Sequence, residues 1–346
     1  MSGILKRYGE LLPLTDSTPR LSLGEGNTPL LRLARMGDGL GIDLHVKVEG
    51  MNPTGSFKDR GMVLAVSKAL EEGTRAVVCA STGNTSASAA AYAAAAGIPC
   101  FVLLPAGKVA MGKLAQATAL GARVLAVRGN FDQALDLAVR ASREMGLTLV
   151  NSLNPYRLWG QRTAAWEVTD ELGKAPDWLA IPVGNAGNIT AYWTGFVQYK
   201  NLGMSNSVPR MMGFQAEGSC PLVKGEVFDN PETVATAIRI GRPVSGKKAI
   251  AAARMTGGSF VSVTDAEILE AQHRLASSEG VFAEPASCAP LAGLFKLHRE
   301  GSLPGGIRVV AVLTGNGLKD TETATKGLPK PIEIEGSWDS LREALS

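Results

Sequence analysis

The sequence has few charged side chains and few aromatic ones. Charged residues make up 19% of the 346 positions and aromatic residues 5%, whereas about 25% of an ordinary domain is charged. The 35 Lys and Arg residues nearly balance the 32 Asp and Glu residues, so the net charge is only +3. This balance argues against a broad basic surface for nucleic acid and against an acidic disordered chain.

Histidine and cysteine are also scarce, with three and four residues, and neither type has the spacing of a metal site. Widely spaced cysteines are typical of buried thiols in a reducing compartment, so we expect a cytoplasmic protein. The most apolar stretch, residues 87–105, is rich in alanine and is interrupted by Gly97 and Pro99. It predicts a buried helix and strand rather than a membrane span. We therefore expect no bound metal and no membrane contact.

Glycine, by contrast, is abundant at 40 residues, and short apolar runs alternate with helix-period segments. This alternation predicts an α/β fold in which mostly parallel sheets are flanked by helices. The length predicts about two domains, with a boundary in the polar stretch Asn151–Pro155. The expected strands are Leu44–Glu49, Ala76–Ala80, Cys100–Leu104, Arg123–Val127, Thr148–Val150, Trp178–Val183, Met211–Gln215 and Arg308–Leu313. The expected helices are Phe57–Leu70, Thr85–Ala96, Met111–Leu120, Phe131–Met145, one beginning at Gly187, Asp265–Ser278 and Pro285–Glu300.

Nucleotide-binding motifs are incomplete. No Gly-x-Gly-x-x-Gly follows a strand, and the two segments that resemble a P-loop end in Lys113-Leu114 and Lys247-Lys248. Both therefore lack the Ser or Thr that holds magnesium in that motif. A nucleotide-binding module is the weakest interpretation.

Four polar segments lie where a predicted strand or loop leads into a helix. In the first, Lys58 stands in the first turn of a predicted helix. The positive helix end favours a neutral amine, which a Schiff-base lysine requires. The alternative is an ordinary surface lysine paired with Asp59. The second segment, residues 81–86, offers hydroxyls, an amide and backbone N–H groups that suit a carboxylate or a ring hydroxyl.

The third segment, residues 184–188, has small residues that can wrap a phosphate at a helix start. The fourth, residues 313–317, places the hydroxyl of Thr314 at the end of another strand. A lysine, a phosphate cradle and two polar strand ends are together what a pyridoxal phosphate site needs.

These segments resemble the fold type II pyridoxal-phosphate enzymes, the tryptophan synthase beta-like group, and within it the threonine synthases of the shorter class. The resemblance extends from Gly24-Glu25-Gly26-Asn27-Thr28-Pro29-Leu30 to Leu313-Thr314-Gly315-Asn316-Gly317-Leu318-Lys319-Asp320. The motif Ser56-Phe57-Lys58-Asp59-Arg60-Gly61 is its most specific part. Related dehydratases usually carry a glycine run where this chain has Gly-Asn-Ala-Gly-Asn, so Asn185 and Asn188 favour the threonine synthases.

The resemblance implies a two-domain enzyme with pyridoxal 5'-phosphate as cofactor. Residues 45–152 would form a smaller, mobile domain, and residues 1–44 with 153–346 a larger cofactor-binding domain. Lys58 would carry the cofactor and act in catalysis, Asn84 would bond its ring hydroxyl, and Thr314 would face its ring nitrogen. The cofactor phosphate would be held by Gly184, Asn185, Ala186, Gly187 and Asn188.

The implied reaction converts O-phospho-L-homoserine and water to L-threonine and phosphate, the last step of threonine biosynthesis. The substrate carboxylate would bind at Ser81, Thr82, Asn84 and Thr85. Its phosphate needs cations and donors, for which we nominate Lys113, Arg162 and Asn154; Arg162 offers bidentate geometry. A homodimer is expected, with no nucleic-acid partner. The alternatives are a threonine dehydratase-like or cysteate synthase-like enzyme and, from another class, a non-catalytic pyridoxal-phosphate-binding protein.

Overall fold

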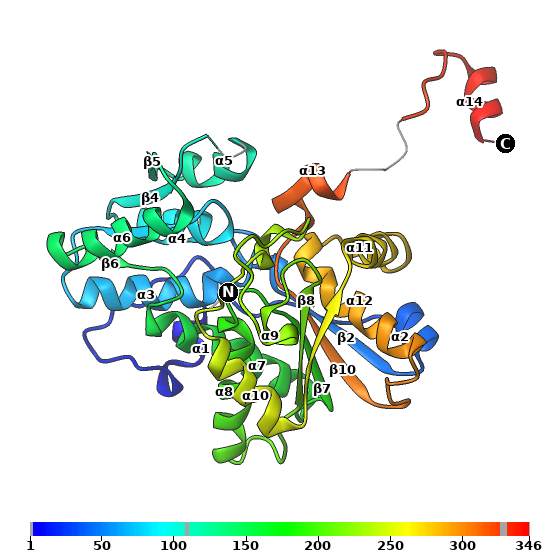
Figure 1. The fold of residues 1–346 in the computed structure, drawn as a ribbon, viewed down its shortest axis with the longest axis horizontal. Coiled ribbons are helices and arrows are strands. Elements are labelled where there is room, and N and C mark those ends of the chain that lie inside the picture. The colour runs from blue at the N-terminus through cyan, green and yellow to red at the C-terminus, as the bar shows by residue number, and fades with distance from the viewer. Residues whose placement is uncertain (1–2, 108–110, 326–330, 346) are drawn as a thin grey trace.

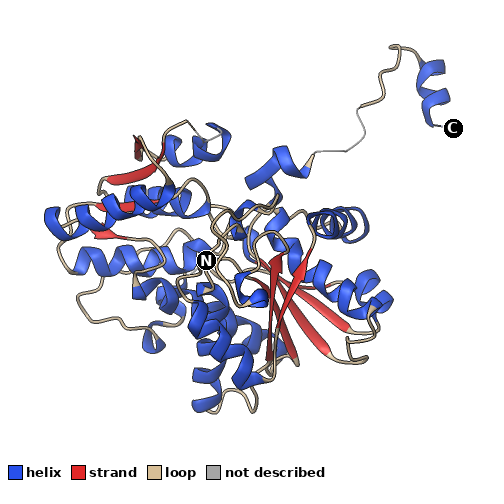
Figure 2. Cartoon of the chain, viewed as in Figure 1, coloured by secondary structure: helices blue, strands red, loops and turns tan. Residues whose placement is uncertain are grey.

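The computed structural model describes residues 3–107, 111–325 and 331–345, and its strands form two separate sheets (Figures 1 and 2). The larger sheet has the order β1-β2-β10-β7-β8-β9 and is parallel except for the β1–β2 pair. Its strands are β1 Leu30–Arg32, β2 Asp43–Val48, β7 Trp178–Pro182, β8 Arg210–Ala216, β9 Phe260–Val263 and β10 Arg308–Leu313. The smaller sheet is fully parallel in the order β5-β4-β3-β6. Its strands are β3 Val77–Ala80, β4 Cys100–Pro105, β5 Arg123–Val127 and β6 Thr148–Leu149.

Helices surround both sheets, as the alternating sequence predicts. The described helices are α1 Ile4–Arg7, α2 Ala34–Leu40, α3 Lys58–Glu71, α4 Asn84–Ala95, α5 Met111–Ala119, α6 Phe131–Met145, α7 Pro155–Leu172, α8 Gly187–Asn201, α9 Pro221–Lys224, α10 Gly246–Thr256, α11 Asp265–Glu279, α12 Pro285–Arg299, α13 Thr321–Ala324 and α14 Trp338–Leu345. Short 3-10 turns are η1 Gly9–Leu11, η2 Glu49–Met51, η3 Thr236–Ile238 and η4 Gly317–Asp320. Among the described residues, no helix combines the length and the hydropathy needed to cross a bilayer.

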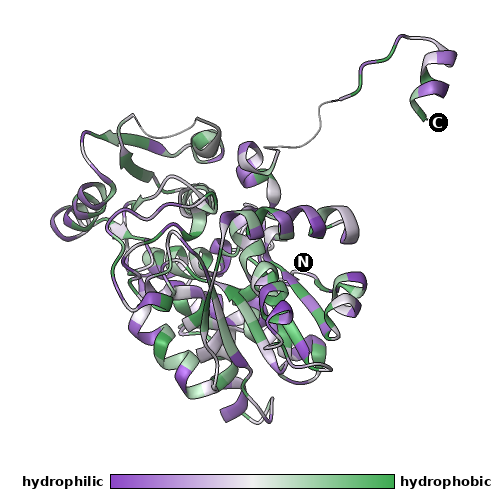
Figure 3. Cartoon of the chain, turned by 45° about the vertical axis from the view of Figure 1, so that its right-hand side comes forward, coloured by the Kyte–Doolittle hydropathy of each residue, from purple (hydrophilic) through white to green (hydrophobic). Residues whose placement is uncertain are grey.

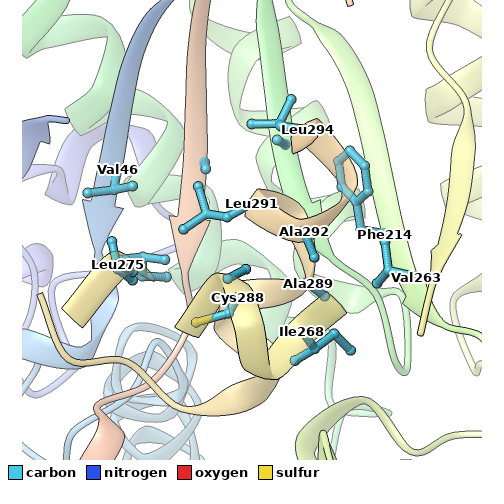
Figure 4. Close-up of a cluster of buried hydrophobic side chains, with 14 of the residues drawn as sticks. Val46, Phe214, Val263, Ile268, Leu275, Cys288, Ala289, Leu291, Ala292 and Leu294 are labelled. Atoms are coloured by element: carbon cyan, nitrogen blue, oxygen red, sulfur yellow. The ribbon is translucent and has the colours of Figure 1, made fainter. Parts of the chain in front are cut away.

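The larger sheet is covered on both faces, which is why its two central strands, β10 and β7, are almost entirely apolar. One face packs against α2, α11 and α12. Figure 4 shows Leu294 of α12 beside Phe214 of β8, and Ala289 of the same helix beside Ile268 of α11. The other face packs against α7, α8 and α10. In Figure 3 the hydrophobic colour accordingly concentrates on the strands, while the surrounding helices are mixed.

The α/β fold with mostly parallel sheets is confirmed, and most predicted elements fall within a residue or two of the observed ones. The bounds of β5 and α6 are those predicted. The predicted domain limit between residues 44 and 45 falls inside β2, a strand of the larger sheet. Residues 151–154 do separate β6 of the smaller sheet from α7.

Helix α7 was not predicted, and its contact with α3 determines much of the site. The two helices cross where both carry glycine. A Cβ atom at Gly160 would overlap the Arg60 carbonyl, and one at Gly61 would lie 2.6 Å from the Arg157 carbonyl oxygen and 2.8 Å from its Nε. Because such distances are too short for real Cβ atoms, only glycine lets these backbones approach so closely.

Candidate active site

Lys58 begins α3, at the end of a loop that is tied to the larger sheet. The Phe57 N–H donates to the Thr314 carbonyl oxygen at 3.0 Å, just beyond the end of β10. Burial, together with the charge of Arg157 and against the opposing effect of Glu284, lowers the pKa of the Lys58 amine to about 7. An amine with this pKa is largely available in its neutral form near neutral pH, as the sequence motif predicts.

The residue after Lys58 points the other way. Asp59 is buried and accepts hydrogen bonds from the Thr54 N–H at 2.7 Å, the Thr54 hydroxyl at 2.6 Å and the Ser88 hydroxyl at 2.6 Å. No described ion pair joins it to Lys58 in residues 3–107, 111–325 and 331–345. The alternative of a surface Lys58–Asp59 pair is therefore wrong, and Asp59 instead anchors the loop and α4 to the start of α3.

Arg60 anchors α3 from the opposite side. Its guanidinium is fully buried between Glu49 of η2 and Glu167 of α7. It donates to the Glu49 carboxylate at 2.6 and 2.8 Å and to the Glu167 carboxylate at 2.6 and 2.8 Å. Lys47 adds a 3.0 Å ion pair to Glu167. Two carboxylates thus satisfy the planar guanidinium, and the network fixes Lys58 against α7.

The ends of β3 and β10 bring Asn84 and Thr314 to one buried carboxylate. Asn84, the first residue of α4, donates through Nδ2 to the two Glu284 oxygens at 3.3 and 3.1 Å. The Thr314 hydroxyl donates to Glu284 at 3.4 Å and shares a 3.0 Å hydrogen bond with Ser287. Burial raises the pKa of Glu284, against the lowering effects of Asn84, Lys319 and Lys58.

The glycine-containing loop between β7 and α8 has the features of an anion cradle. Ala186 adopts a left-handed conformation at φ +62° as the N-cap of α8, without a side-chain hydrogen bond to the helix. A Cβ atom at Gly184 would lie 2.9 Å from the Ile238 Cα. Both polar atoms of the Asn188 side chain are buried without a partner among the described residues. Because unpartnered buried amides are costly, these residues fit a bound phosphate. Asn185 instead makes hydrogen bonds within the protein. Its side-chain Nδ2 donates to the Ser152 hydroxyl at 3.3 Å, and its backbone carbonyl accepts from the Ser245 N–H at 3.1 Å.

The loop before α4 is partly exposed and lacks a side-chain cap. Ser81, Thr82 and Thr85 are half-buried. The N-cap residue is Gly83, which has no side chain to accept a hydrogen bond from the first N–H groups of the helix. The Gly83 N–H donates to the Ser81 hydroxyl at 3.2 Å. The first backbone N–H groups of α4 are thus available to a carboxylate.

The three residues nominated for the substrate phosphate have different surroundings. Lys113 lies on α5, and its side chain is outside the described residues. Asn154 caps α7, accepting from the Tyr156 N–H at 3.0 Å and donating to the Leu149 carbonyl at 3.0 Å. The Arg162 guanidinium lies 3.7 Å from the centre of the Trp159 ring and donates to Gln198 of α8 at 3.4 Å. No contact described for Arg162 reaches Lys58, Asn84 or Thr314.

The structure adds two residues that the sequence did not reveal, Arg157 and Glu284. Arg157 is buried and donates to the Val150 carbonyl at 2.7 Å, and its Nε has no hydrogen-bond partner within the part of the chain that the structure describes. Burial lowers its pKa to about 10. Asn154 followed by Pro155 is a helix-start signal that could have located α7 and hence Arg157. Glu284 lies just before Pro285, where the sequence gives no comparable sign.

The family model described as "Pyridoxal-phosphate dependent enzyme" matches residues 21–315. The chain belongs to this family. Its cofactor is pyridoxal phosphate, as Lys58 and the cradle at residues 184–188 predict.

Relatives within the family are named threonine synthase. The chain is 58% identical to one from Halalkalibacterium halodurans, covering 93% of this chain and 91% of the relative. A second, from Synechocystis sp., is also 58% identical, with 96% and 89% covered. A third, from Mycobacterium tuberculosis, is 53% identical, with 96% and 93% covered. The predicted resemblance to the threonine synthases is therefore confirmed.

Solved structures of lower identity share the fold. Maize serine racemase superposes with a TM-score of 0.75 at 19% identity, covering 92% of this chain and 93% of that one. The processed form of threonine deaminase isoform 2 from Solanum lycopersicum has a TM-score of 0.73 at 22% identity, with 87% and 84% covered. They support the fold class and not the choice of substrate.

Proposed function

We propose that this chain converts O-phospho-L-homoserine and water to L-threonine and phosphate. The observation that carries the proposal is that Lys58, whose pKa burial and the charge of Arg157 lower to about 7, lies within electrostatic range of the buried cation Arg157. An amine that exchanges protons at neutral pH and a guanidinium with an unpartnered Nε match a substrate with an acidic Cα–H and a phosphate. The threonine synthase relatives support the same choice.

The cofactor, when bound, withdraws electrons from the substrate carbon next to the amine. We assign its phosphate to residues 184–188, its ring hydroxyl to Asn84 and its ring nitrogen to Thr314. Lys58 carries the cofactor and, once displaced by the substrate amine, accepts the proton from Cα and returns one later. A pKa near 7 suits both directions of that transfer at neutral pH.

The net reaction breaks the Cγ–O bond and one Cβ–H bond of the substrate and one O–H bond of water, and it makes a Cβ–O and a Cγ–H bond. The protons released from Cβ and from water are taken up by Cγ and by the departing phosphate. The Cγ–O bond breaks and its electron pair leaves with the phosphate. Water then supplies a hydroxyl to Cβ, and a proton is added at Cγ to complete the methyl group. Ser81, Thr82, Asn84 and Thr85 hold the substrate carboxylate at the start of α4, so that Cα lies within reach of Lys58.

For the substrate phosphate we propose Arg157 as the main cation. It acts on the Lys58 amine electrostatically, whereas Arg162 lies over Trp159 and contacts α8. The nomination of Arg162, Lys113 and Asn154 stays a prediction. Asn154 keeps one N–H beyond its bond to Leu149 and so can still donate.

A substrate panel tests the proposed function. The purified holoenzyme is incubated separately with O-phospho-L-homoserine, L-threonine and O-phospho-L-serine. We expect equal amounts of phosphate and threonine from the first, and only minor 2-oxobutanoate from the second. Conversion of threonine to 2-oxobutanoate as the fastest reaction would instead establish a dehydratase, and phosphate release from O-phosphoserine a cysteate synthase-like enzyme. A bound cofactor with no turnover of any amino acid would establish the non-catalytic alternative.

We further propose that the protein works as a homodimer in the cytoplasm. The four buried free cysteines support a reducing compartment. Light scattering coupled to gel filtration measures the assembly: a mass of about twice the 36.1 kDa chain supports the dimer, and a mass of one chain contradicts it.

A further inference from the structure

Glu284 is a buried carboxylate whose hydrogen bonds all lead to the proposed cofactor site. It precedes Pro285 and occupies the N-cap position of α12, yet its side chain makes no hydrogen bond to that helix. Glutamate is not among the preferred N-cap residues. A role in capping therefore does not explain why a carboxylate is buried here.

The backbone fixes where this carboxylate lies. The Glu284 N–H donates to the Gly315 carbonyl at 3.0 Å, which ties the start of α12 to the end of β10. A Cβ atom at residue 315 would lie 2.5 Å from the Glu284 carboxyl carbon. The glycine is required because the carboxylate occupies the space that a side chain would need.

Glu284 contacts both residues assigned to the cofactor ring. Asn84 donates to its two oxygens at 3.3 and 3.1 Å, and the Thr314 hydroxyl donates to it at 3.4 Å. We propose that Glu284 is a positioning residue, whose carboxylate orients the Asn84 amide and the Thr314 hydroxyl toward the cofactor ring. The inference deepens the proposed function and rests on the assignment of Asn84 and Thr314 to that ring.

The orientation follows from the chemistry of an acceptor. A carboxylate oxygen accepts hydrogen bonds, so the NH₂ end of Asn84 faces Glu284, with Nδ2 at 3.3 and 3.1 Å from its two oxygens. The second N–H of that group then remains for the oxygen on the ring. In the same way Glu284 and Ser287 both lie within hydrogen-bond distance of the Thr314 hydroxyl and hold its oxygen at the position assigned to the ring nitrogen.

The charge of Glu284 also reaches the lysine that carries the cofactor. It opposes the lowering of the Lys58 pKa by burial and by Arg157. The charged groups that act on Glu284 are Lys58 of α3 and Lys319 of η4, and those that act on Lys58 are Arg157 of α7 and Glu284 itself. Burial and the charge of Glu284 in turn raise the pKa of the Cys288 thiol of α12. Removing the negative charge should therefore favour the unprotonated form of the nitrogen that joins Lys58 to the cofactor.

The test compares the holoenzymes of Glu284→Gln, Glu284→Asp and the wild type. The control is Glu300→Gln, an exposed glutamate at the other end of α12. The visible absorption band of the bound cofactor is titrated with pH, and cofactor binding is measured after resolution and reconstitution. For Glu284→Gln we expect the spectral midpoint to move to lower pH by about 0.5 unit or more, and the cofactor dissociation constant to rise about tenfold. Glu284→Asp keeps the negative charge, so its spectral midpoint should lie close to that of the wild type.

Steady-state kinetics and a double variant separate positioning from simple packing. In Glu284→Gln, kcat for O-phospho-L-homoserine should fall about tenfold while KM changes less than about twofold. The effect on cofactor binding should largely vanish in an Asn84→Ala background, because the group to be oriented is then gone. An unchanged spectrum and unchanged cofactor binding in Glu284→Gln would overturn the proposal, as would equal losses in both backgrounds.

The test still decides if Glu284→Gln fails to fold or if the proposed substrate proves to be wrong. If Glu284→Gln does not fold, Glu284→Asp still decides, since the proposal predicts a wild-type spectral midpoint with reduced kcat. A Glu284→Asp spectrum that titrates at a clearly different pH contradicts it. The spectral and binding measurements need only the cofactor, so failure of the proposed substrate would leave them valid.

Discussion

Arg60 of α3 and Glu167 of α7 form a bidentate ion pair across the contact between these two helices. The two terminal nitrogens of the guanidinium donate to the two carboxylate oxygens at 2.8 and 2.6 Å, and both side chains are fully buried. The pair connects the helix that begins with Lys58 to the helix that carries Arg157. Its integrity therefore affects both stability and the geometry of the site.

Replacing Glu167 by Gln should destabilise the protein by about 3–5 kcal/mol, because it leaves the Arg60 charge buried with only part of its compensation. Urea unfolding of the holoprotein measures this difference. The control is Arg140→Ala, which removes an exposed pair with Glu144 and should cost less than about 1 kcal/mol. A Glu167→Gln variant as stable as the control would contradict a stabilising role for the network.

The same carboxylate should contribute to acid sensitivity. Burial raises the pKa of Glu167, but Arg60 and Lys47 outweigh it, so the pKa falls to about 2 from an ordinary value of 4.5. A lowered pKa contributes stability that is fully present above about pH 4.5 and is lost as the pH falls toward 2. Unfolding free energy measured from pH 6 to 3 should therefore decline less steeply in Glu167→Gln than in the wild type. Parallel pH profiles would refute this assignment.

Lys58 should react as an amine at unusually low pH. In cofactor-free protein, acylation by an amine reagent should be half-maximal near pH 7, since burial and Arg157 lower its pKa to about 7. In Arg157→Met the midpoint should move to higher pH, because a repelling charge is gone. Lys200, exposed at the end of α8, is the internal reference, and peptide mass spectrometry quantifies both sites. A Lys58 midpoint matching that of Lys200 would contradict the electrostatic account.

Lys58→Ala tests the catalytic assignment itself. The variant should lose the visible absorption of covalently bound cofactor and essentially all phosphate release, because no other group on α3 can replace the amine. Lys200→Ala should retain both. Phosphate release at the wild-type rate in Lys58→Ala would refute the proposed chemistry.

Arg157→Met and Arg162→Met form a matched pair for the substrate phosphate. A charged hydrogen bond contributes about 1.5–3 kcal/mol, so Arg157→Met should reduce kcat/KM for O-phospho-L-homoserine by about 10- to 150-fold. Arg162→Met should reduce it far less, since that guanidinium lies over Trp159. A larger loss in Arg162→Met would reverse the assignment and support the sequence-based nomination.

Much of the site could be predicted because its residues lie at strand ends with distinctive local chemistry. Lys58 at a helix start and the small residues at 184–188 carry their signal in neighbouring sequence. The fold followed from the apolar strands, whose full burial leaves continuous runs such as Trp178–Pro182.

Helix α7 escaped prediction because its buried residues mix polar with apolar side chains. Arg157, Gln161 and Glu167 are all buried on it, so the apolar period that marks an ordinary surface helix is absent. The partners that neutralise these side chains come from distant segments, such as Arg60 of α3. A polar residue that is buried through long-range pairing cannot be distinguished from an exposed one in a single sequence.

Gly61 and Gly160 bring the Lys58 amine and the Arg157 guanidinium close to each other, although neither glycine contacts the amine. Because neither has a side chain, the α3 and α7 backbones meet and Arg157 lies close enough to lower the pKa of Lys58. A single methyl group at either position would separate the helices and raise the proton affinity of Lys58. The proton affinity of Lys58 is thus set in part by two glycines that have no functional group of their own.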